Sequence, residues 1–328
     1  MLATATIDGE NAPTIGGTDA PVPWWSFTKT VLSVAALSLV DRGALDLDAP
    51  MEERPFTLRQ LLRHEAGLPD YGSVNRYHED VAAGKAPWPA SRMLVAVQAD
   101  RLRFVPGTGW AYSNIGYLMV AKAIETGSGL PLAAALSSLV FDPSRLQTAR
   151  LAMSANDLVD VEMGGAAGYD PGWVYHGLVT GTAADAARLL HALMSGKLLQ
   201  PSTLSAMLEG HPLPQHRSEA HPDPAYGLGV MLSATNPRLH PIGHTGEGPG
   251  SRIAVYALAD RIAAVWTGLP AGNDAEKMAA RLLACSPARL TDQVQLARFR
   301  KRTYSGKALR GSGLIVAKRA AFPKSVPD

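Results

Sequence analysis

The sequence has very little cysteine: Cys285 is the only one in 328 residues. A single cysteine excludes an internal disulfide framework and any zinc site built from cysteines. Long apolar runs are also missing, since the longest, Val31–Val40, is well short of the roughly 20 residues that a membrane-spanning helix needs. Met1–Ile7 has no basic residue and no long apolar run, so no secretory signal is expected. As written, the sequence predicts a cytoplasmic protein without a transmembrane segment, or a periplasmic or secreted one if the true N-terminus is missing.

Several catalytic motifs are absent as well. There is no His-Glu-x-x-His, no Gly-x-Ser-x-Gly and no Gly-Lys-Ser/Thr, which disfavours metal hydrolases, serine hydrolases with a nucleophile elbow, and phosphate-binding loops. His216 and His221 lie in a predicted loop without suitable partners, so no metal is expected. The formal net charge is only +2, which argues against a general nucleic-acid partner.

What the sequence does contain is short strand-like runs near both ends and helical patterns between them. Hydrophobic residues make up 46% of the chain, enough to bury a large core. Strands are expected at 3–7, 12–15, 226–232, 252–257 and 262–267. Helices are expected at 26–41, 58–64, 91–101, 114–126, 132–139, 183–195, 202–208 and 274–284, with an exposed loop over 211–224. This order predicts an α/β fold of the α+β type, in which an antiparallel sheet built from both chain termini is flanked by helices.

The same order predicts three regions. Residues 1–56 and 210–288 would form the sheet region, and residues 57–209 an inserted, mainly helical region. Residues 289–328 carry ten basic side chains against two acidic ones, and we interpret them as a solvated, partly disordered extension. A contact with nucleic acid, a membrane or another partner is the alternative for this basic segment.

Ser26 and Lys29 open the predicted helix over 26–41, which is apolar on nearly every face and is therefore expected to be buried. Residues three apart share a helix face, so the Lys29 ammonium can reach the Ser26 hydroxyl. The N–H groups and partial positive charge at a helix N-terminus favour a developing alkoxide and lower the pKa of a nearby amine. A serine hydroxyl needs such activation to act as a nucleophile. Alone, the spacing is more typical of an N-cap serine with a surface lysine.

Tyr112-Ser113-Asn114 stands between a Pro-Gly loop and an apolar helical stretch. A tyrosine beside a lysine can be driven towards phenolate and serve as a general base. The Asn114 amide both donates and accepts, so it can hold a substrate amide. The alternative is that Ser113 or Asn114 caps the following helix.

His244-Thr245-Gly246 stands at the start of the last strand-like region and is followed by Glu247. Gly246 would let a substrate lie against the backbone. Thr245 offers a hydroxyl, and His244 offers an imidazole for a substrate carboxylate or for proton transfer. The alternative is a structural histidine near a strand.

Ser-x-x-Lys, Tyr-Ser-Asn and His-Thr-Gly occur here in the order of a known signature. The sequence resembles the serine β-lactamase and penicillin-binding-protein superfamily, in particular the branch of class C β-lactamases, D-alanyl-D-alanine carboxypeptidases and related esterases. The resemblance covers roughly residues 1–284, and His64, Gly67 and Pro69 look structural in that context. Only 25 residues precede Ser26, fewer than in most members, which predicts a reduced sheet edge and cleft wall. The matching segments are Leu61–Tyr71, Phe104–Tyr117, Gly177–Asp185, Tyr226–Gly229 and Gly243–Gly246.

The resemblance implies a serine hydrolase that forms an acyl-enzyme on an amide or ester, with no metal or other cofactor. The implied partner is a small-molecule or peptide substrate, and the oligomeric state is open. Ser26 would attack the carbonyl, Lys29 and Tyr112 would shuttle its proton, and Asn114 would hold the acyl-side amide. The backbone N–H groups of Ser26 and Glu247 would hold the oxyanion.

The resemblance also assigns substrate contacts to His244, Thr245 and Gly246. Because His244 stands where other members carry lysine, we expect a weaker preference for an anionic substrate end, with a pH dependence near the histidine pKa of about 6.5. Arg252 is a second candidate for carboxylate binding, although a structural strand residue is the alternative. Two other functions stay open: a carboxylesterase of the same fold, and a non-catalytic binding protein, against which the intact Ser26 and Lys29 argue.

Overall fold

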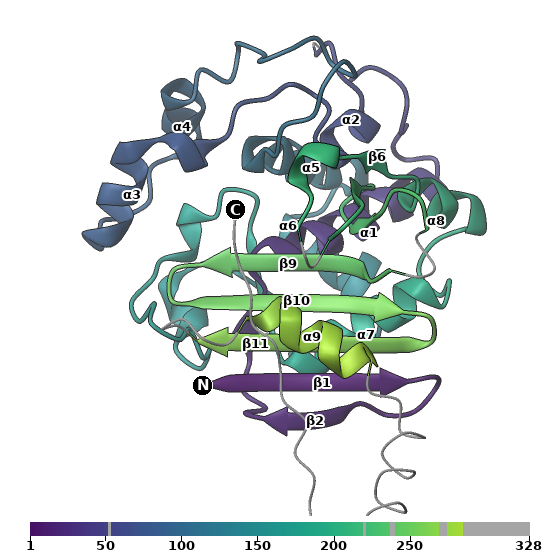
Figure 1. Cartoon of the computed structure of the whole chain (residues 1–328). Coiled ribbons are helices and arrows are strands. Elements are labelled where there is room, and N and C mark those ends of the chain that lie inside the picture. The colour runs from purple at the N-terminus through teal and green to yellow at the C-terminus, as the bar shows by residue number, and fades with distance from the viewer. Residues whose placement is uncertain (52–53, 219–220, 237–239, 269–273, 285–328) are drawn as a thin grey trace, which may run out of the picture. The chain divides into compact units, whose positions relative to one another are not determined.

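The first strand, β1 (Leu2–Asp8), buries every second side chain, as expected for a strand with one face on a core. It pairs antiparallel with β11 (Arg261–Gly268) along its whole length. Segments from the start of the chain and from beyond residue 210 therefore share one sheet (Figure 1), which confirms the predicted fold class. The computed structural model describes residues 1–51, 54–218, 221–236, 240–268 and 274–284.

In the described part of the chain, the larger sheet has eight strands in the order β2-β1-β11-β10-β9-β8-β7-β6, and neighbouring strands are antiparallel. Its remaining strands are β2 (Thr14–Gly17), β6 (His211–Pro212), β7 (Pro224–Tyr226), β8 (Met231–Ser233), β9 (Ile242–Gly248) and β10 (Ser251–Leu258). A smaller sheet joins β3 (Val22–Pro23), β5 (Leu178–Gly181) and β4 (Arg150–Ala152) in that order.

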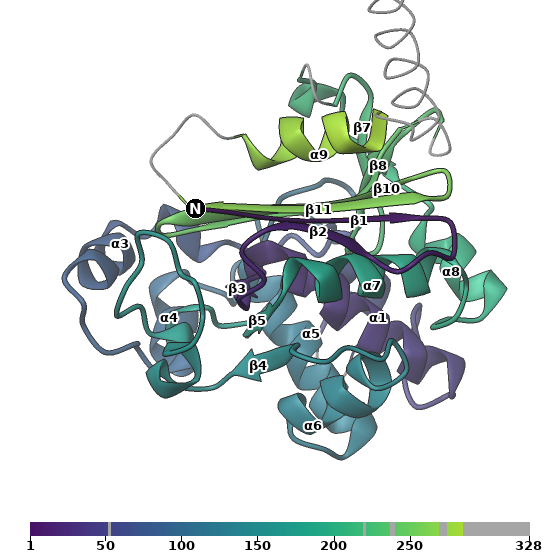
Figure 2. The ribbon, with the colours of Figure 1, turned by 90° about the horizontal axis from the view of Figure 1, so that it is seen from below.

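Helices cover both faces of the larger sheet (Figure 2): α9 packs on β10 and β11 from one side, and α7 packs on β1, β10 and β11 from the other. The α-helices are α1 (Thr28–Asp41), α2 (Leu58–Leu62), α3 (Asn75–Ala82), α4 (Ala90–Ala96), α5 (Asn114–Ser128), α6 (Leu132–Leu136), α7 (Ala183–Met194), α8 (Pro201–Met207) and α9 (Ala275–Ala284). A π-helical segment, η3 (Ser137–Phe141), continues α6. Short 3-10 turns are η1 (Trp25–Phe27), η2 (Tyr71–Ser73), η4 (Ala155–Leu158), η5 (Pro171–Trp173) and η6 (Pro214–His216).

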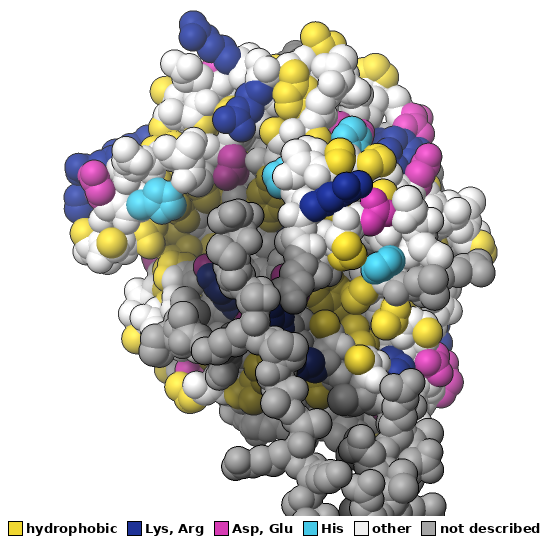
Figure 3. Space-filling view, in the orientation of Figure 1, with side chains coloured by type: hydrophobic (Ala, Val, Ile, Leu, Met, Phe, Trp, Pro, Cys, Tyr) yellow, Lys and Arg dark blue, Asp and Glu magenta, His cyan; other side chains and the backbone are white. Residues whose placement is uncertain are grey.

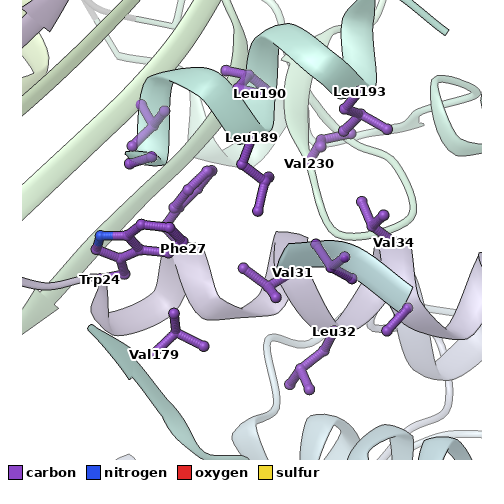
Figure 4. Close-up of a cluster of buried hydrophobic side chains, with 14 of the residues drawn as sticks. Trp24, Phe27, Val31, Leu32, Val34, Val179, Leu189, Leu190, Leu193 and Val230 are labelled. Atoms are coloured by element: carbon purple, nitrogen blue, oxygen red, sulfur yellow. The ribbon is translucent and has the colours of Figure 1, made fainter. Parts of the chain in front are cut away.

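Helix α1 is the centre of the core. Its residues from Thr28 to Leu39 are all buried, as the sequence predicts for a helix without a polar face. Figure 4 shows Val31, Leu32 and Val34 of α1 among apolar side chains of α7 and of the segments carrying Val179 and Val230. Lys29, in the first turn of α1, therefore lies on an element that is surrounded on all sides.

The structure corrects several element predictions, among them the helix expected over 91–101, which ends at Ala96. The predicted strand over 226–232 is two short strands, β7 and β8, because Gly229 takes a left-handed backbone (φ +81°) and the Gly227 N–H donates to the Val230 carbonyl. The predicted exposed loop over 211–224 contains β6 and the buried Leu213. The predicted helix over 26–41 starts at Thr28, since the residues before it form the turn η1.

The described structure does not separate the predicted sheet region from the predicted helical region. Residues 1–284 group into one compact unit, so the divisions at residues 56 and 209 stay predictions. Cys285 and the basic extension over 289–328 lie outside the described residues.

On the face shown in Figure 3, described basic and acidic side chains are interspersed. Among the described residues no single helix is long and apolar enough to cross a membrane, although α5 and Leu132–Phe141 together qualify by length and composition.

The central position of α1 predicts a large effect of a cavity there. Leu32 is fully buried, so Leu32→Ala should lower the free energy of unfolding by about 2–5 kcal/mol. Val95→Ala is the matched control, because Val95 is 78% exposed and its truncation should change the free energy by less than about 0.5 kcal/mol. Denaturant titration of both variants measures the two values. Equal effects of the two substitutions would contradict the central role of α1.

Candidate active site

Ser26 is presented by a strained turn. The preceding residue, Trp25, has a left-handed backbone with φ +42°, which a bulky side chain rarely adopts. The Trp25 indole N–H donates to Ser251 Oγ at 2.9 Å, and its ring packs so closely on β9 that a Cβ at Gly248 would lie 2.4 Å from it. Contacts with two strands of the larger sheet thus hold the turn in a conformation that it would not adopt alone.

The smaller sheet fixes the same turn from the other side. The Trp24 N–H donates to the Val179 carbonyl at 2.9 Å, and the Val179 N–H donates to Thr28 Oγ1 at 3.1 Å. Strand β5 therefore forms hydrogen bonds with the chain both before and after Ser26. The nucleophile candidate is half-buried between two sheets, where small backbone movements are resisted by regular hydrogen bonds.

Lys29 is fully buried, and its amine lies against three polar atoms. Nζ is 3.2 Å from Ser26 Oγ, 2.7 Å from Asn114 Oδ1 and 3.2 Å from His176 Nε2. Burial lowers the pKa of Lys29 to about 7, although the nearby Asp70 carboxylate acts to raise it. The geometry confirms that Lys29 reaches Ser26, and burial makes a neutral amine accessible near neutral pH.

Tyr112 contacts Ser26 from the opposite side. Its hydroxyl donates to Ser26 Oγ at 3.0 Å, and Lys29 Nζ lies 4.9 Å from the centre of its ring. Burial raises the pKa of Tyr112 above its usual value, and the hydrogen bond to Ser26 only partly offsets this. Burial thus opposes the phenolate that a neighbouring lysine could favour, and a protonated Tyr112 is the form that donates to Ser26.

Asn114 is the first residue of α5, after Ser113. Ser113 Oγ accepts from the Gly116 N–H at 3.0 Å, so the helix-cap interpretation holds for Ser113. The Asn114 N–H donates to Asp70 Oδ1 at 2.7 Å, and Asn114 Oδ1 accepts from Lys29. With its oxygen engaged, the amide has Nδ2 left for a substrate.

His244 lies on β9 and has both ring nitrogens engaged. Nδ1 lies against the Thr245 carbonyl, which can only accept, so Nδ1 carries the proton. Nε2 is 2.9 Å from the Tyr226 hydroxyl and accepts from it. Burial lowers the pKa of His244 to about 3. The expected titration near pH 6.5 is therefore wrong for the free protein, in which His244 is neutral.

Gly246 has a packing role that the sequence did not predict. A Cβ at this position would lie 2.6 Å from the Trp24 carbonyl oxygen and 2.8 Å from the Ser26 nitrogen. Such distances are far below van der Waals contact, so glycine here lets β9 approach the turn that carries Ser26. Gly246 also lines one of the two cavities described below, so its predicted contact with a substrate stays a prediction.

Glu247 and Arg252 pair with each other on the exposed strand surface. Arg252 donates to Glu247 Oε1 at 2.8 Å, with side chains 45% and 60% exposed respectively. Exposed pairs of this kind contribute about 0–1 kcal/mol. Arg252 does not itself line either of the two cavities described next, but its partner Glu247 lines both, so a carboxylate-binding role for Arg252 stays a prediction.

Two cavities meet at Ser26 and Glu247, which line both. The Tyr112-side cavity has a volume of about 320 Å³, and the Asn114-side cavity about 340 Å³. The Tyr112-side cavity is also lined by Trp110, Tyr112, Leu213, His216, His221, Pro224, Ala225, Tyr226, Met231, Leu232, His244, Thr245 and Gly246. The Asn114-side cavity is also lined by Trp25, Tyr71, Gly72, Tyr77, His78, Val81, Asn114, Tyr169, Val174, His176, Gly248 and Pro249.

Sequence reasoning missed two residues of the site. His176 was not singled out by any motif, and Asp70 appeared only within the matching segment Leu61–Tyr71. No spacing rule links either to Ser26, because folding alone brings them together. His64, in contrast, behaves as predicted: its Nδ1 accepts from the Ser113 N–H at 3.2 Å and its ring lies 4.4 Å from the Tyr112 ring. In the described residues no cluster of three or more histidine, cysteine or acidic side chains could hold a metal ion.

Comparison with known proteins decides the family. The family model described as Beta-lactamase matches residues 12–286, most of the chain. The chain belongs to this family. The relatives that it matches include an esterase and D-aminopeptidases, and an amidase structure at 19% identity shares its fold.

Individual relatives differ in their chemistry. Esterase EstB of Burkholderia gladioli is 33% identical over 138 residues, 36% of this chain and 35% of the esterase. A D-aminopeptidase of Cereibacter sphaeroides is 29% identical over 164 residues, 47% of this chain and 32% of that protein. Both matches span about a third of the relative's length. A D-stereospecific amidohydrolase from Streptomyces sp. superposes with a TM-score of 0.71 at 22% identity, covering 87% of this chain and 94% of that one, and so shares the fold.

The close approach of β9 to the Ser26 turn predicts that Gly246→Ala disables this β-lactamase-family site. The added methyl group would displace the Ser26 turn, and a displacement of about 1 Å lowers reaction rates by roughly 100-fold. The measurement is the rate of Ser26 labelling by a fluorophosphonate. Gly116→Ala is the control, because a Cβ there meets only ordinary contacts from 3.8 Å outwards. If Gly246→Ala reacts at the unmodified rate, the tight packing of β9 on the turn is not needed.

Proposed function

We propose that this chain hydrolyses a small ester or amide through an acyl-enzyme on Ser26. The observation that carries the proposal is that Ser26 Oγ lies between Lys29 Nζ at 3.2 Å and the Tyr112 hydroxyl at 3.0 Å, where two cavities meet. A base on one side of the nucleophile and a neutral acid on the other are the two groups that acyl transfer needs.

Acylation begins with Lys29 as the neutral amine. Lys29 takes the proton of Ser26 Oγ while Oγ forms a bond to the substrate carbonyl carbon. The carbonyl electron pair moves onto oxygen, where the backbone N–H groups of Ser26 and Glu247 would receive it. A donor of this kind contributes about 3–4 kcal/mol to transition-state stabilisation.

Collapse of the tetrahedral intermediate needs a proton for the leaving group. Tyr112 is suited to give it, because burial keeps its hydroxyl protonated. The bond between the carbonyl carbon and the leaving group breaks as that group takes the Tyr112 proton, and the Lys29 ammonium restores the tyrosine. In deacylation, water attacks the carbonyl carbon of the ester on Ser26 while Lys29, through Tyr112, takes the water proton. The bond between the carbonyl carbon and Ser26 Oγ then breaks, Oγ takes that proton back from the Lys29 ammonium, and the acid is released.

The two cavities would hold different parts of the substrate. The Asn114-side cavity would hold the acyl group, with Asn114 Nδ2 donating to it, and the Tyr112-side cavity would hold the leaving group. Neither lysine nor arginine occurs among the described residues that line the Tyr112-side cavity, and His244 is neutral. No lysine or arginine is therefore in direct contact with the leaving-group side, and the neighbouring Arg252 is neutralised by its pairing with Glu247, which favours a carboxylesterase over an enzyme for substrates with a terminal carboxylate.

Intact-protein mass spectrometry tests both parts of the proposal. A fluorophosphonate and p-nitrophenyl acetate should each add one group to the protein, and benzylpenicillin should react at least about 10-fold more slowly than p-nitrophenyl acetate because its carboxylate has no fixed cation to bind. Ser26→Ala should remove every adduct. An adduct that persists in Ser26→Ala would contradict the nucleophile, and no adduct with any probe would favour the non-catalytic alternative. Faster labelling by benzylpenicillin would overturn the esterase preference.

The pKa of Lys29 predicts the pH dependence of the reaction. The reactive form is the neutral amine, whose fraction rises with pH and reaches half at about pH 7. The rate constant for Ser26 labelling should therefore rise tenfold per pH unit below 7 and level off above it. A profile that is flat from pH 5.5 to 8.5, or that rises only above pH 9, would contradict Lys29 as the base.

A further inference from the structure

His176 is the third polar partner of the Lys29 amine and has no place in the mechanism above. It lies between η5 and β5, and its side chain is only 2% exposed. Its Nε2 atom is 3.2 Å from Lys29 Nζ. The other partners of the amine are Ser26 Oγ and Asn114 Oδ1, so His176 completes a set of three polar atoms around Nζ.

The number of hydrogens on the Lys29 amine determines how these three polar atoms orient its lone pair. A neutral lysine amine has two N–H donors and one lone pair, and only the lone pair can take the serine proton. Asn114 Oδ1 is an acceptor and uses one N–H. If His176 Nε2 accepts the second N–H, the lone pair is left facing Ser26 Oγ. Without an acceptor at that position, the amine can turn its lone pair away from the nucleophile.

The surroundings of His176 make it an acceptor. Nδ1 is buried and has no hydrogen-bond partner among the described residues, so no neighbouring acceptor or donor fixes its protonation. Burial lowers the pKa of His176 well below its usual value, and the nearby Lys29 charge acts in the same direction. The imidazole is therefore neutral, and an ammonium at Lys29 requires Nε2 as the bare nitrogen, with the proton on Nδ1.

We propose that His176 is a positioning residue that accepts a hydrogen bond from Lys29 and so aims the lone pair of the base at Ser26. This inference rests on the proposed function of Lys29. The same bond stabilises the ammonium that forms when the serine proton arrives, because Nε2, Asn114 Oδ1 and Ser26 Oγ then accept all three N–H groups. The arrangement parallels a general base held in place by a third group.

The other titratable groups near Lys29 act at longer range. The ring centres of Tyr112 on the loop before α5 and Tyr117 on α5 lie 4.9 and 5.5 Å from Nζ. The Asp70 charge acts on Lys29, and the Lys29 charge acts on His64 and on His244 of β9. Among the described residues, His176 is the histidine within hydrogen-bond distance of the amine.

Two substitutions separate positioning from packing. His176→Leu still fills the buried position but removes the hydrogen-bond acceptor. His176→Gln keeps an acceptor, the amide oxygen, on a side chain of similar length. With p-nitrophenyl acetate, His176→Leu should lower kcat roughly 10- to 100-fold and leave KM within about twofold. The acid limb of its pH–kcat profile should move to lower pH. The reason is that the Lys29 ammonium loses a hydrogen-bond acceptor, which lowers the pKa of the amine. His176→Gln should recover most of kcat and return the limb towards pH 7. His191→Leu on α7 serves as the control, because His191 lines neither of the two cavities, and it should match the unmodified protein.

Nitrogen-15 NMR of the histidine-labelled protein gives a readout that does not depend on turnover. We expect the His176 signals, assigned by their loss in His176→Gln, to show a protonated Nδ1 and a bare Nε2 from pH 6 to 8. A protonated Nε2, or unchanged kcat and acid limb in a folded His176→Leu, would overturn the inference. Failure of the proposed function would look different, since the unmodified protein would then show no turnover that Ser26→Ala abolishes, whatever the tautomer of His176.

Discussion

The burial of the Lys29 amine is the constraint on which the rest of the site depends. An amine in water holds its proton until about pH 10.4, and such a group could not take a proton from serine near neutral pH. Here α1 carries the lysine into the core, and the loss of hydration brings its pKa down to about 7. The surrounding polar atoms then decide where the amine points, which is a geometric problem that the fold solves with Asn114 and His176.

A second constraint lies in the backbone of the nucleophile turn. Trp25 has a backbone conformation that costs about 1–3 kcal/mol, and strands from both sheets hold it there. Glycines at 246 and 248 are what allow β9 to come close enough to do so. The position of Ser26 is therefore a property of the packed sheets rather than of the short motif that marks it in the sequence.

Local patterns were enough to predict the fold class and the central residues of the site. Apolar residues all round 28–39 predict a buried helix, and the spacing of Ser26 and Lys29 places their side chains on one face. The family resemblance added Tyr112 and Asn114, which the structure brings to the same point. These predictions succeeded because helix periodicity and motif spacing are local, whereas each remaining feature depends on a contact between distant segments.

The failures show this dependence. His244 was expected to titrate near pH 6.5, but Tyr226, 18 residues away, occupies its Nε2 atom and burial keeps the ring neutral. The neighbouring lysine suggested that Tyr112 can become a phenolate, but burial raises its pKa more than the hydrogen bond to Ser26 lowers it. His176 meets Lys29 across 147 residues of sequence, a distance that no motif spans. Burial and long-range contact, which decide these three cases, cannot be read from residue order.

The most direct test of the central claim is the pKa of Lys29 itself. Carbon-13 NMR of the lysine Cε atoms, followed over pH with Lys29→Met to assign the signal, reports the charge of each amine separately from any reaction. The account predicts one lysine that titrates at about pH 7 and disappears in Lys29→Met. A Lys29 signal that titrates above pH 10 would show that the amine stays charged at neutral pH and would contradict its role as the base.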